Sequence, residues 1–424
     1  SPCTPLAEPT RKLHRIGPQR RHPVGFYVLC LAVACERGAA YTLSALAVLM
    51  LAERYGYSRA EALRIVSLVS AASYLGTVPA GRLTDKVIDP HRALSTSAAL
   101  LAVGYAALIW SSPLALILSL AFIIAGSALF KPSTQAVLMG LLPSGDARVE
   151  AAQIGFYMAV NAGATLGALA AGLLAREGGW GAPFALAAAL MLAARFLLTW
   201  YRADLLPRPR AYQLHRVAAS STQQRRNALT IAALIFAMLV YTVCFGQVEG
   251  SLLLWAQDRT DRIVLGFEVP AAWFVALPAV LVLMLGPVQL ALLPWLQRRI
   301  GTHRLVAGGL ISVALAFAIL LSAAASATPR VSMSCLIGVM ALLVVGELLV
   351  APLGIALILR LTPHRHCGVV VGAWYVSGAI GFWLAGEIGA WSLSGTGLLG
   401  LLVLVLLPVA GAAALLVARR CDGR

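Results

Sequence analysis

Continuous apolar runs of roughly twenty residues, about twelve of them, fill this sequence. A bilayer core is about 30 Å thick, so a helix of about twenty residues can cross it. Inside lipid every backbone polar group needs an internal partner, which leaves only helices and closed barrels as spanning structures. The runs are continuous and do not alternate as barrel strands do. The chain is therefore expected to be an all-α, multi-spanning membrane protein.

Composition supports this fold class. Hydrophobic residues make up 60% of the chain and charged residues only 12%, whereas a soluble domain carries about a quarter charged residues. Most of the surface must therefore face lipid. The expected spans lie near 25–51, 62–81, 93–110, 113–142, 150–175, 181–202, 227–256, 268–296, 303–326, 331–361, 367–391 and 396–418.

The longest interruption, residues 203–226, is polar and basic and separates the spans six and six. A transporter built from two repeated halves shows this arrangement. The expected parts are an N-terminal segment (1–24), a six-helix bundle (25–202), a basic linker (203–226), a second six-helix bundle (227–418) and a C-terminal tail (419–424).

Basic residues gather before the first span, in the linker and after the last span. By the positive-inside rule these regions are cytoplasmic, so we expect both termini in the cytoplasm. The formal net charge of +16 then reflects membrane topology, and no nucleic-acid partner is expected. Residues 1–22 lack an apolar stretch and do not resemble a signal peptide.

Two neighbouring ionic residues, Glu36 and Arg37, lie inside the first apolar run, near mid-bilayer. A charge at that depth costs several kcal/mol unless it faces a cavity or a partner. Because adjacent helical side chains point about 100° apart, we do not expect these two to pair face to face, and at least one should reach another helix. Tyr41 follows Arg37 by one turn, so both are expected to line one cavity.

Two further ionic residues stand alone in later spans. Lys131 is one of only three lysines and lies in the fourth span, where it either serves function or snorkels to the interface. Glu347 lies in the tenth span, either as a ligand group or as a packed neutral acid. Tyr157 and Asn161 are one turn apart in the fifth span and face the same way.

Four stretches carry a resemblance to a known family: "CERGAAY", "GSALFKPSTQAVLMGLL", "GFYMAVNAG" and "GELLVAPLGIALILRLTP". In this order and at these spans they resemble the proton-dependent oligopeptide transporters of the major facilitator superfamily. "AGRLTDKVIDPHR" resembles the loop between spans two and three of that superfamily, with Gly81, Asp85, Lys86 and Arg92 at the motif positions.

The resemblance implies the major facilitator fold and proton-coupled import of di- or tripeptides, or related zwitterions, by alternating access. It implies that Lys131 helps to hold the carboxylate of the substrate and that Glu347 holds its amino group. The full set of implied substrate contacts is Arg37, Tyr41, Tyr74, Lys131, Tyr157, Asn161, Glu347 and Trp374.

The chain also departs from the family pattern. Val33 stands in place of the first glutamate of the first-span motif, and Ser44 in place of a second arginine. In span seven Gly246 occupies the place of an acid, and Glu249 follows one turn on. Glu249 is expected either to act as the partner of Lys131 or to lie near the outer mouth. Span eight has Leu277 or Pro278 where the family has asparagine, and Ala351 replaces a serine.

Glu36 is the residue expected to carry the coupled proton. Burial favours its neutral form, whereas Arg37 and Lys131 favour its carboxylate. Arg37, Lys131 and Glu249 are expected to take part in the coupling.

Two other function classes stay open at this point. One is an efflux pump of the same superfamily that exchanges protons for a drug or peptide-like natural product. The other is a non-transporting receptor. No motif for an enzyme is present, and we expect no cofactor beyond the proton gradient and no metal. The expected state is a monomer in a bacterial inner membrane, with a small-molecule substrate and the lipid bilayer as partners.

Overall fold

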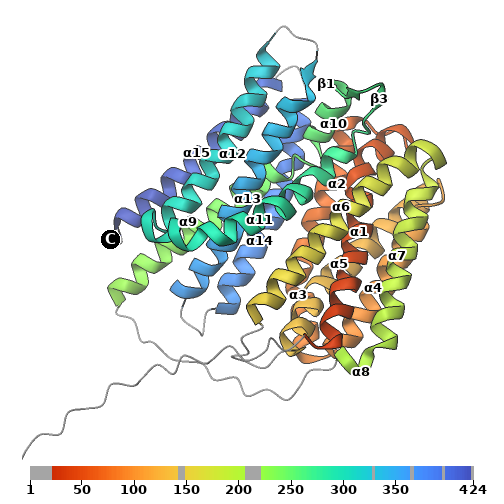
Figure 1. Ribbon diagram of the computed structural model, residues 1–424, viewed down its shortest axis with the longest axis horizontal. Helices are drawn as coiled ribbons and strands as arrows, with labels where there is room; N and C mark the ends of the chain where they lie inside the picture. The colour runs from red at the N-terminus through yellow and green to blue at the C-terminus, as the bar shows by residue number, and fades with distance from the viewer. Residues whose placement is uncertain are drawn as a thin grey trace, which may run out of the picture.

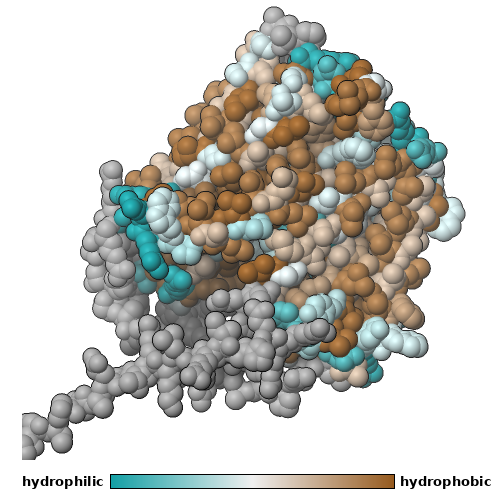
Figure 2. Space-filling model, in the orientation of Figure 1, coloured by the Kyte–Doolittle hydropathy of each residue, from teal (hydrophilic) through white to brown (hydrophobic). Residues whose placement is uncertain are grey.

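The computed structural model describes residues 22–141, 149–205, 221–326, 330–362, 367–393 and 397–421. These residues are almost all helical (Figure 1). Eleven helices in the described part of the chain are long and apolar enough to cross a membrane. Figure 2 shows apolar side chains across the middle of the visible face and hydrophilic ones toward its ends. The expected all-α membrane protein is confirmed.

The described residues of the first half form eight helices, α1 to α8. α1 packs along α6 and α7, and α4 packs between α5 and α7. α4 is 18 residues long and less apolar than the eleven, and it brings the spanning helices to the expected number of about twelve. The helices are α1 (Val24–Glu53), α2 (Arg59–Leu75), α3 (Thr77–Lys86), α4 (Pro90–Ala107), α5 (Pro113–Leu141), α6 (Val149–Gly178), α7 (Gly181–Trp200) and α8 (Arg202–Leu205).

The second half packs α9 against α13, α14 and α15, and α12 against α13 and α15. Its helices are α9 (Ser221–Phe245), α10 (Ser251–Asp258), α11 (Trp273–Arg299), α12 (Thr302–Ala325), α13 (Met333–Leu361), α14 (Cys367–Ser392) and α15 (Gly397–Cys421). Four two-residue strands accompany them: β1 (Thr260–Asp261) pairs with β4 (Val331–Ser332) in parallel, and β2 (Ile263–Val264) pairs with β3 (Phe267–Glu268) in antiparallel.

Two expected spans are wrong in detail. The run 227–256 is not one helix, because the chain turns over residues 246–250 between α9 and α10. The Gln247 side chain donates to Val243 O (3.1 Å) and Ala385 O (2.9 Å), so it satisfies carbonyl oxygens near the break. The span placed at 268–296 starts too early, since residue 268 belongs to β3 and the helix begins at Trp273.

Parts of the expected domain division lie outside the described residues. These are most of the N-terminal segment, residues 206–220 of the linker and the last three residues of the tail.

Small residues let two central helices of the first half touch through their backbones. A Cβ atom at Gly163 of α6 would overlap the Ala34 carbonyl oxygen of α1, and one at Gly167 would overlap the Gly38 carbonyl oxygen. The Thr42 hydroxyl lies 3.2 Å from Gly167 O, to which it donates. Close crossings of this kind are typical of small residues at helix interfaces in membranes.

The two halves meet along two seams, α2 against α14 and α6 against α11. Near the α10 end polar contacts cross these seams. Arg59 pairs with Asp258, and Arg64 Nε lies 3.1 Å from a Glu387 carboxylate oxygen.

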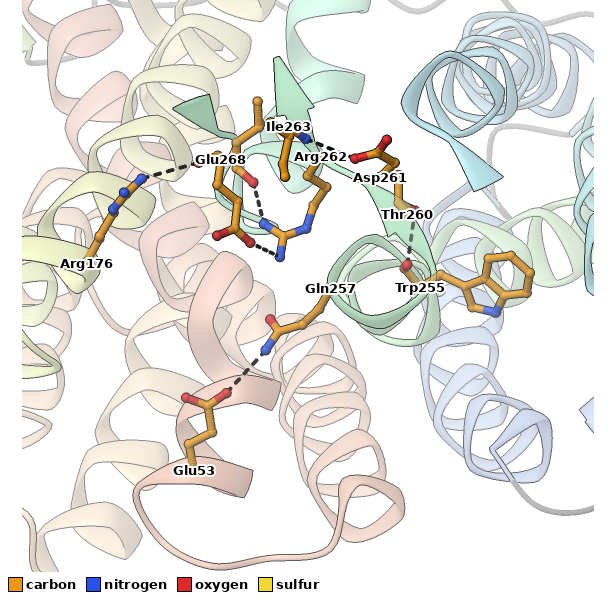
Figure 3. Close-up of polar contacts among 10 residues, drawn as sticks. Glu53, Arg176, Trp255, Gln257, Thr260, Asp261, Arg262, Ile263 and Glu268 are labelled. Atoms are coloured by element: carbon orange, nitrogen blue, oxygen red, sulfur yellow. Dashed lines mark hydrogen bonds and ion pairs between the residues drawn. The ribbon is translucent and has the colours of Figure 1, made fainter. Parts of the chain in front are cut away.

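Further contacts close the same end (Figure 3). Gln257 donates to Glu53 (3.4 Å), and Arg176 of α6 donates to Glu268 O (3.3 Å) and stacks on the Phe267 ring. These contacts join the two halves of the protein at the α10 end.

Candidate functional site

Glu36 and Arg37, on the middle of α1, form a two-pronged ion pair. Arg37 Nε lies 2.6 Å from one Glu36 carboxylate oxygen, and Nη2 contacts the other. The expectation that these neighbours would not pair is wrong. The long arginine side chain spans the 100° between their Cα–Cβ directions and folds back onto its neighbour. Glu36 is only 1% exposed, and the guanidinium satisfies both of its oxygens.

Tyr41 lies one turn beyond Arg37, within a cluster of ionic side chains. The cluster consists of Glu36, Arg37, Lys131, Glu249 and Glu347. The Tyr41 hydroxyl is within electrostatic range of Arg37, and also of Glu249 and Glu347 in the other half. The structure therefore brings basic and acidic groups of both halves around one side chain.

Lys131, on α5, places its ammonium 3.5 Å from the centre of the Tyr74 ring of α2. The other neighbour of that ring is Phe382 of α14, with ring centres 5.0 Å apart. Lys131 also lies within electrostatic range of Glu36, Arg37 and Glu249. Its ammonium thus points into the cluster, and the snorkelling alternative does not hold.

Glu347, on α13, lies within electrostatic range of the Tyr157 hydroxyl of α6. These two side chains belong to opposite halves of the protein. Asn161, one turn beyond Tyr157, is 7% exposed and donates its amide to Tyr157 O at 2.9 Å. Tyr157 keeps 37% of its surface exposed, so the cluster is not closed over at this point.

Glu249 lies in the turn between α9 and α10, where the helix break turns it toward α1. Its carboxylate lies within electrostatic range of Ser44 and Arg37 of α1 and of Lys131. Glu249 therefore belongs to the same group of ionic side chains as Lys131, but among the described residues the two form no ion pair, so its role as the partner of Lys131 stays a prediction.

Other expected site residues lie elsewhere. Trp374 of α14 is 6% exposed, and its ring packs against Gly354 of α13 inside the second half. Gly81 and Arg92 flank the junction of α3 and α4, where the Asp89 carboxylate accepts from two backbone amides. The side chains of Asp85 and Lys86 lie outside the described residues.

Sequence reasoning missed two tyrosines. Tyr241 of α9 is buried and lies within electrostatic range of Glu347 and Tyr157. Tyr375 of α14 is 42% exposed and lies within range of Tyr74. Both are phenols inside apolar runs, and the rule that singled out Tyr157 could have found them.

Only two of the five charged groups in the described cluster neutralise each other in an ion pair. Among the described residues the Glu36–Arg37 pair is its only ion pair. Lys131 lies over the Tyr74 ring, Glu249 lies near the Ser44 hydroxyl, and Glu347 lies near the Tyr157 phenol. These three charged groups have neutral partners, so a ligand that carries charges can replace those partners.

Comparisons with known proteins identify the family and the fold of this chain. A family model described as "Major Facilitator Superfamily" matches residues 29–386. A "Peptide transporter YePEPT" from Yersinia enterocolitica is 27% identical, over 87% of this chain and 88% of the relative. A "Dipeptide and tripeptide permease A" from Escherichia coli is 26% identical, over 86% of this chain and 84% of the relative.

Solved structures share the fold. A peptide transporter POT in complex with sulfate has a TM-score of 0.85 at 21% identity, covering 96% of each chain. A POT family transporter in complex with 5-aminolevulinic acid has a TM-score of 0.80 at 19% identity, covering 93% of this chain and 95% of that one. The expected fold and the resemblance to this transporter family are confirmed.

Proposed function

The chain belongs to the major facilitator superfamily, and we propose that it is a proton-coupled importer of di- or tripeptides, or of related zwitterionic compounds. Relatives named as peptide transporters and permeases support import of this class. They give no support to the efflux alternative.

The observation that carries the proposal is the placement of opposite charges on opposite halves. Lys131 and Arg37 belong to the first half and Glu347 to the second, and Tyr41 lies in electrostatic range of both Arg37 and Glu347. A zwitterion can offer its carboxylate to the cations and its ammonium to Glu347. A ligand held by both halves binds one conformation better than another and so biases alternating access.

Glu36 is the group we assign to the coupled proton. In this structure Glu36 is buried, and Arg37 contacts both of its carboxylate oxygens. Protonation of Glu36 weakens this charge-assisted pairing. Arg37, 21% exposed, is then free to join Lys131 at the substrate carboxylate.

The basic termini and linker support a cytoplasmic location of both chain ends, in a bacterial inner membrane. The α10 end then faces outward, and the structure corresponds to an inward-facing state. We propose that the protein works as a monomer, with bundles at 25–202 and 227–418 joined by the linker at 203–226.

Counterflow in proteoliposomes tests the function. Vesicles loaded with unlabelled Ala-Ala should take up labelled Ala-Ala, and dipeptides should compete where cationic dyes do not. Glu347→Gln should reduce this exchange at least tenfold, because the ligand ammonium loses its charged partner. Competition by dyes but not by dipeptides would favour efflux and refute the proposal.

A further inference from the structure

The helix that carries Glu347 is interrupted by a proline shortly after it. Pro352 lies inside α13. Proline has no backbone N–H, and its ring clashes with the carbonyl group of the residue four positions earlier in the helix. In α13 that residue is Leu348, the immediate neighbour of Glu347. The Leu348 carbonyl oxygen therefore lacks its donor within the helix and needs one from elsewhere, because an unpaired backbone group is costly inside a membrane.

The donor that meets this oxygen comes from a neighbouring helix. Gln289 of α11 is half-buried, and its side-chain amide nitrogen donates to Leu348 O. The amide thus supplies, from α11, the hydrogen bond that Pro352 removes from α13.

Apolar packing holds the same two helix faces together. Val282 lies about two turns before Gln289, on the same face of α11. Val282, Val344 and Leu348 are 1%, 0% and 6% exposed and form a small buried group apart from the main core. Val344 and Leu348 are one turn apart on α13, on either side of Glu347 in the sequence. The face of α11 that bears Gln289 is therefore packed against the stretch of α13 that bears Glu347.

α11 also contacts the first half of the protein, through α6. A Cβ atom at Gly286 would lie 3.7 Å from the Met158 methyl carbon, and Met158 directly follows Tyr157. α11 thus contacts both α6, which carries Tyr157, and α13, which carries Glu347. The Gln289 amide fixes its contact with α13.

The same relation occurs at a second proline of this half. Pro408 lies inside α15, and the residue four positions earlier is Leu404. The thiol of the buried Cys244, on α9, lies 3.8 Å from Leu404 O, to which it donates. Side chains of neighbouring helices therefore meet the carbonyl oxygens that two prolines leave without a helical donor.

We propose that Gln289 is a positioning residue for the substrate site, because its amide replaces the missing N–H of Pro352 and so holds Glu347 in place. It acts through the Leu348 carbonyl group and not through contact with the substrate. The inference rests on the proposed function, in which Glu347 binds the amino group of the ligand. Without the amide, Leu348 O loses its donor and α13 shifts against α11, so Glu347 no longer meets the ligand ammonium.

A double-mutant cycle on the purified full-length protein tests the geometry. Gln289→Met keeps the length of the side chain and removes the donor. Pro352→Ala restores a backbone N–H that can bond to Leu348 O, which makes the Gln289 amide redundant. Gln289→Met should lower the Tm by several degrees in the wild type and by almost nothing in the Pro352→Ala background. If Gln289→Met alone does not fold, Pro352→Ala should restore folding.

The matched control is Gln297→Met, the same substitution at another half-buried glutamine about two turns further along α11. It should leave the Tm unchanged in both backgrounds. An equal fall in Tm for Gln289→Met with and without Pro352 would overturn the inference, since the amide would then not serve the oxygen that the proline frees.

Ligand binding separates positioning from stability. Gln289→Met should weaken binding of Ala-Ala about fivefold or more. Propionyl-alanine has the same shape without the amino group, so it makes no ion pair with Glu347, and its affinity should stay the same. Equal losses for both ligands would contradict a positioning role. Failure of the wild type to bind any dipeptide would refute the proposed function and the role of Glu347 with it, whereas the thermal coupling of Gln289 to Pro352 would still hold.

Discussion

The Lys131 ammonium lies 3.5 Å from the centre of the Tyr74 ring, and this ring also packs against Phe382 of the opposite half. A buried cation over an aromatic ring gains about 2 kcal/mol. Tyr74 thus aims the ammonium into the cluster, a role distinct from direct contact with the substrate through its hydroxyl.

Substitution of Tyr74 separates these two roles. Tyr74→Leu should weaken dipeptide binding at least fivefold, because Lys131 loses the ring that positions it, while Tyr74→Phe should bind nearly as the wild type does. Dissociation constants from calorimetry provide the measurement. If the phenylalanine variant is as impaired as the leucine variant, the hydroxyl and not the ring is what matters.

Glu36→Gln should uncouple transport from the proton gradient. The amide cannot exchange a proton, so vesicles with an inward proton gradient should no longer accumulate labelled dipeptide. Counterflow exchange without a gradient should persist, since it requires only binding and alternation. Glu177→Gln serves as the control for loss of a carboxylate. Undiminished proton-driven accumulation in Glu36→Gln would contradict the assignment of the coupled proton to this residue.

The ion pairs at the α10 end should influence how often that end opens. The Arg59–Asp258 and Arg64–Glu387 pairs are partly exposed, and such pairs contribute at most about 1 kcal/mol each. Asp258→Ala with Glu387→Ala should therefore raise the open population several-fold.

Spin labels at Tyr57 and Ile263, both exposed on opposite halves, would report this change as a longer distance. In a separate variant, the reciprocal exchange Arg59→Asp with Asp258→Arg keeps an ion pair at this position and leaves Glu387 unchanged. This variant should show the short distance of the wild type. An unchanged distance distribution in the double alanine variant would show that apolar packing along the seams alone holds the end closed.

Length and hydropathy predicted most spans because the bilayer imposes both on any helix that crosses it. The sequence did not predict the break between α9 and α10, since the apolar run continues on both sides of residues 246–250 and the Gln247 contact to Ala385 O is tertiary. The two-residue strands are too short to show alternation. These features depend on contacts between distant segments.

The candidate site shows the same limit. Its ionic residues stand out because charges are rare in spans. Arg37, Glu249 and Glu347 lie within electrostatic range of Tyr41, and the shared cavity stays a prediction. The Glu36–Arg37 pairing was missed because helical periodicity gives the direction of Cβ and not the reach of a long side chain. Trp374 was inferred from resemblance alone, and its burial against Gly354 depends on local packing.

Gly163→Ala should destabilise the protein strongly. The added Cβ would meet the Ala34 backbone, which cannot move as a side chain can, and overpacking of this kind costs about 1–3 kcal/mol or more. Gly338→Ala, at a helical glycine with open space around it, is the matched control. Thermal unfolding in detergent should show a lower Tm for the first variant only; equal values would mean that the crossing of α1 and α6 is looser than the structure indicates.

That backbone crossing has a consequence for how the protein handles ligands of different size. Since α1 and α6 are locked together at Gly163 and Gly167, Arg37 and Tyr41 on one helix and Tyr157 and Asn161 on the other should travel as a single body. The distance between these two pairs of side chains therefore stays constant throughout the transport cycle. Adjustment to a longer or shorter substrate then depends on Glu249 and Glu347, which lie in the opposite half of the protein.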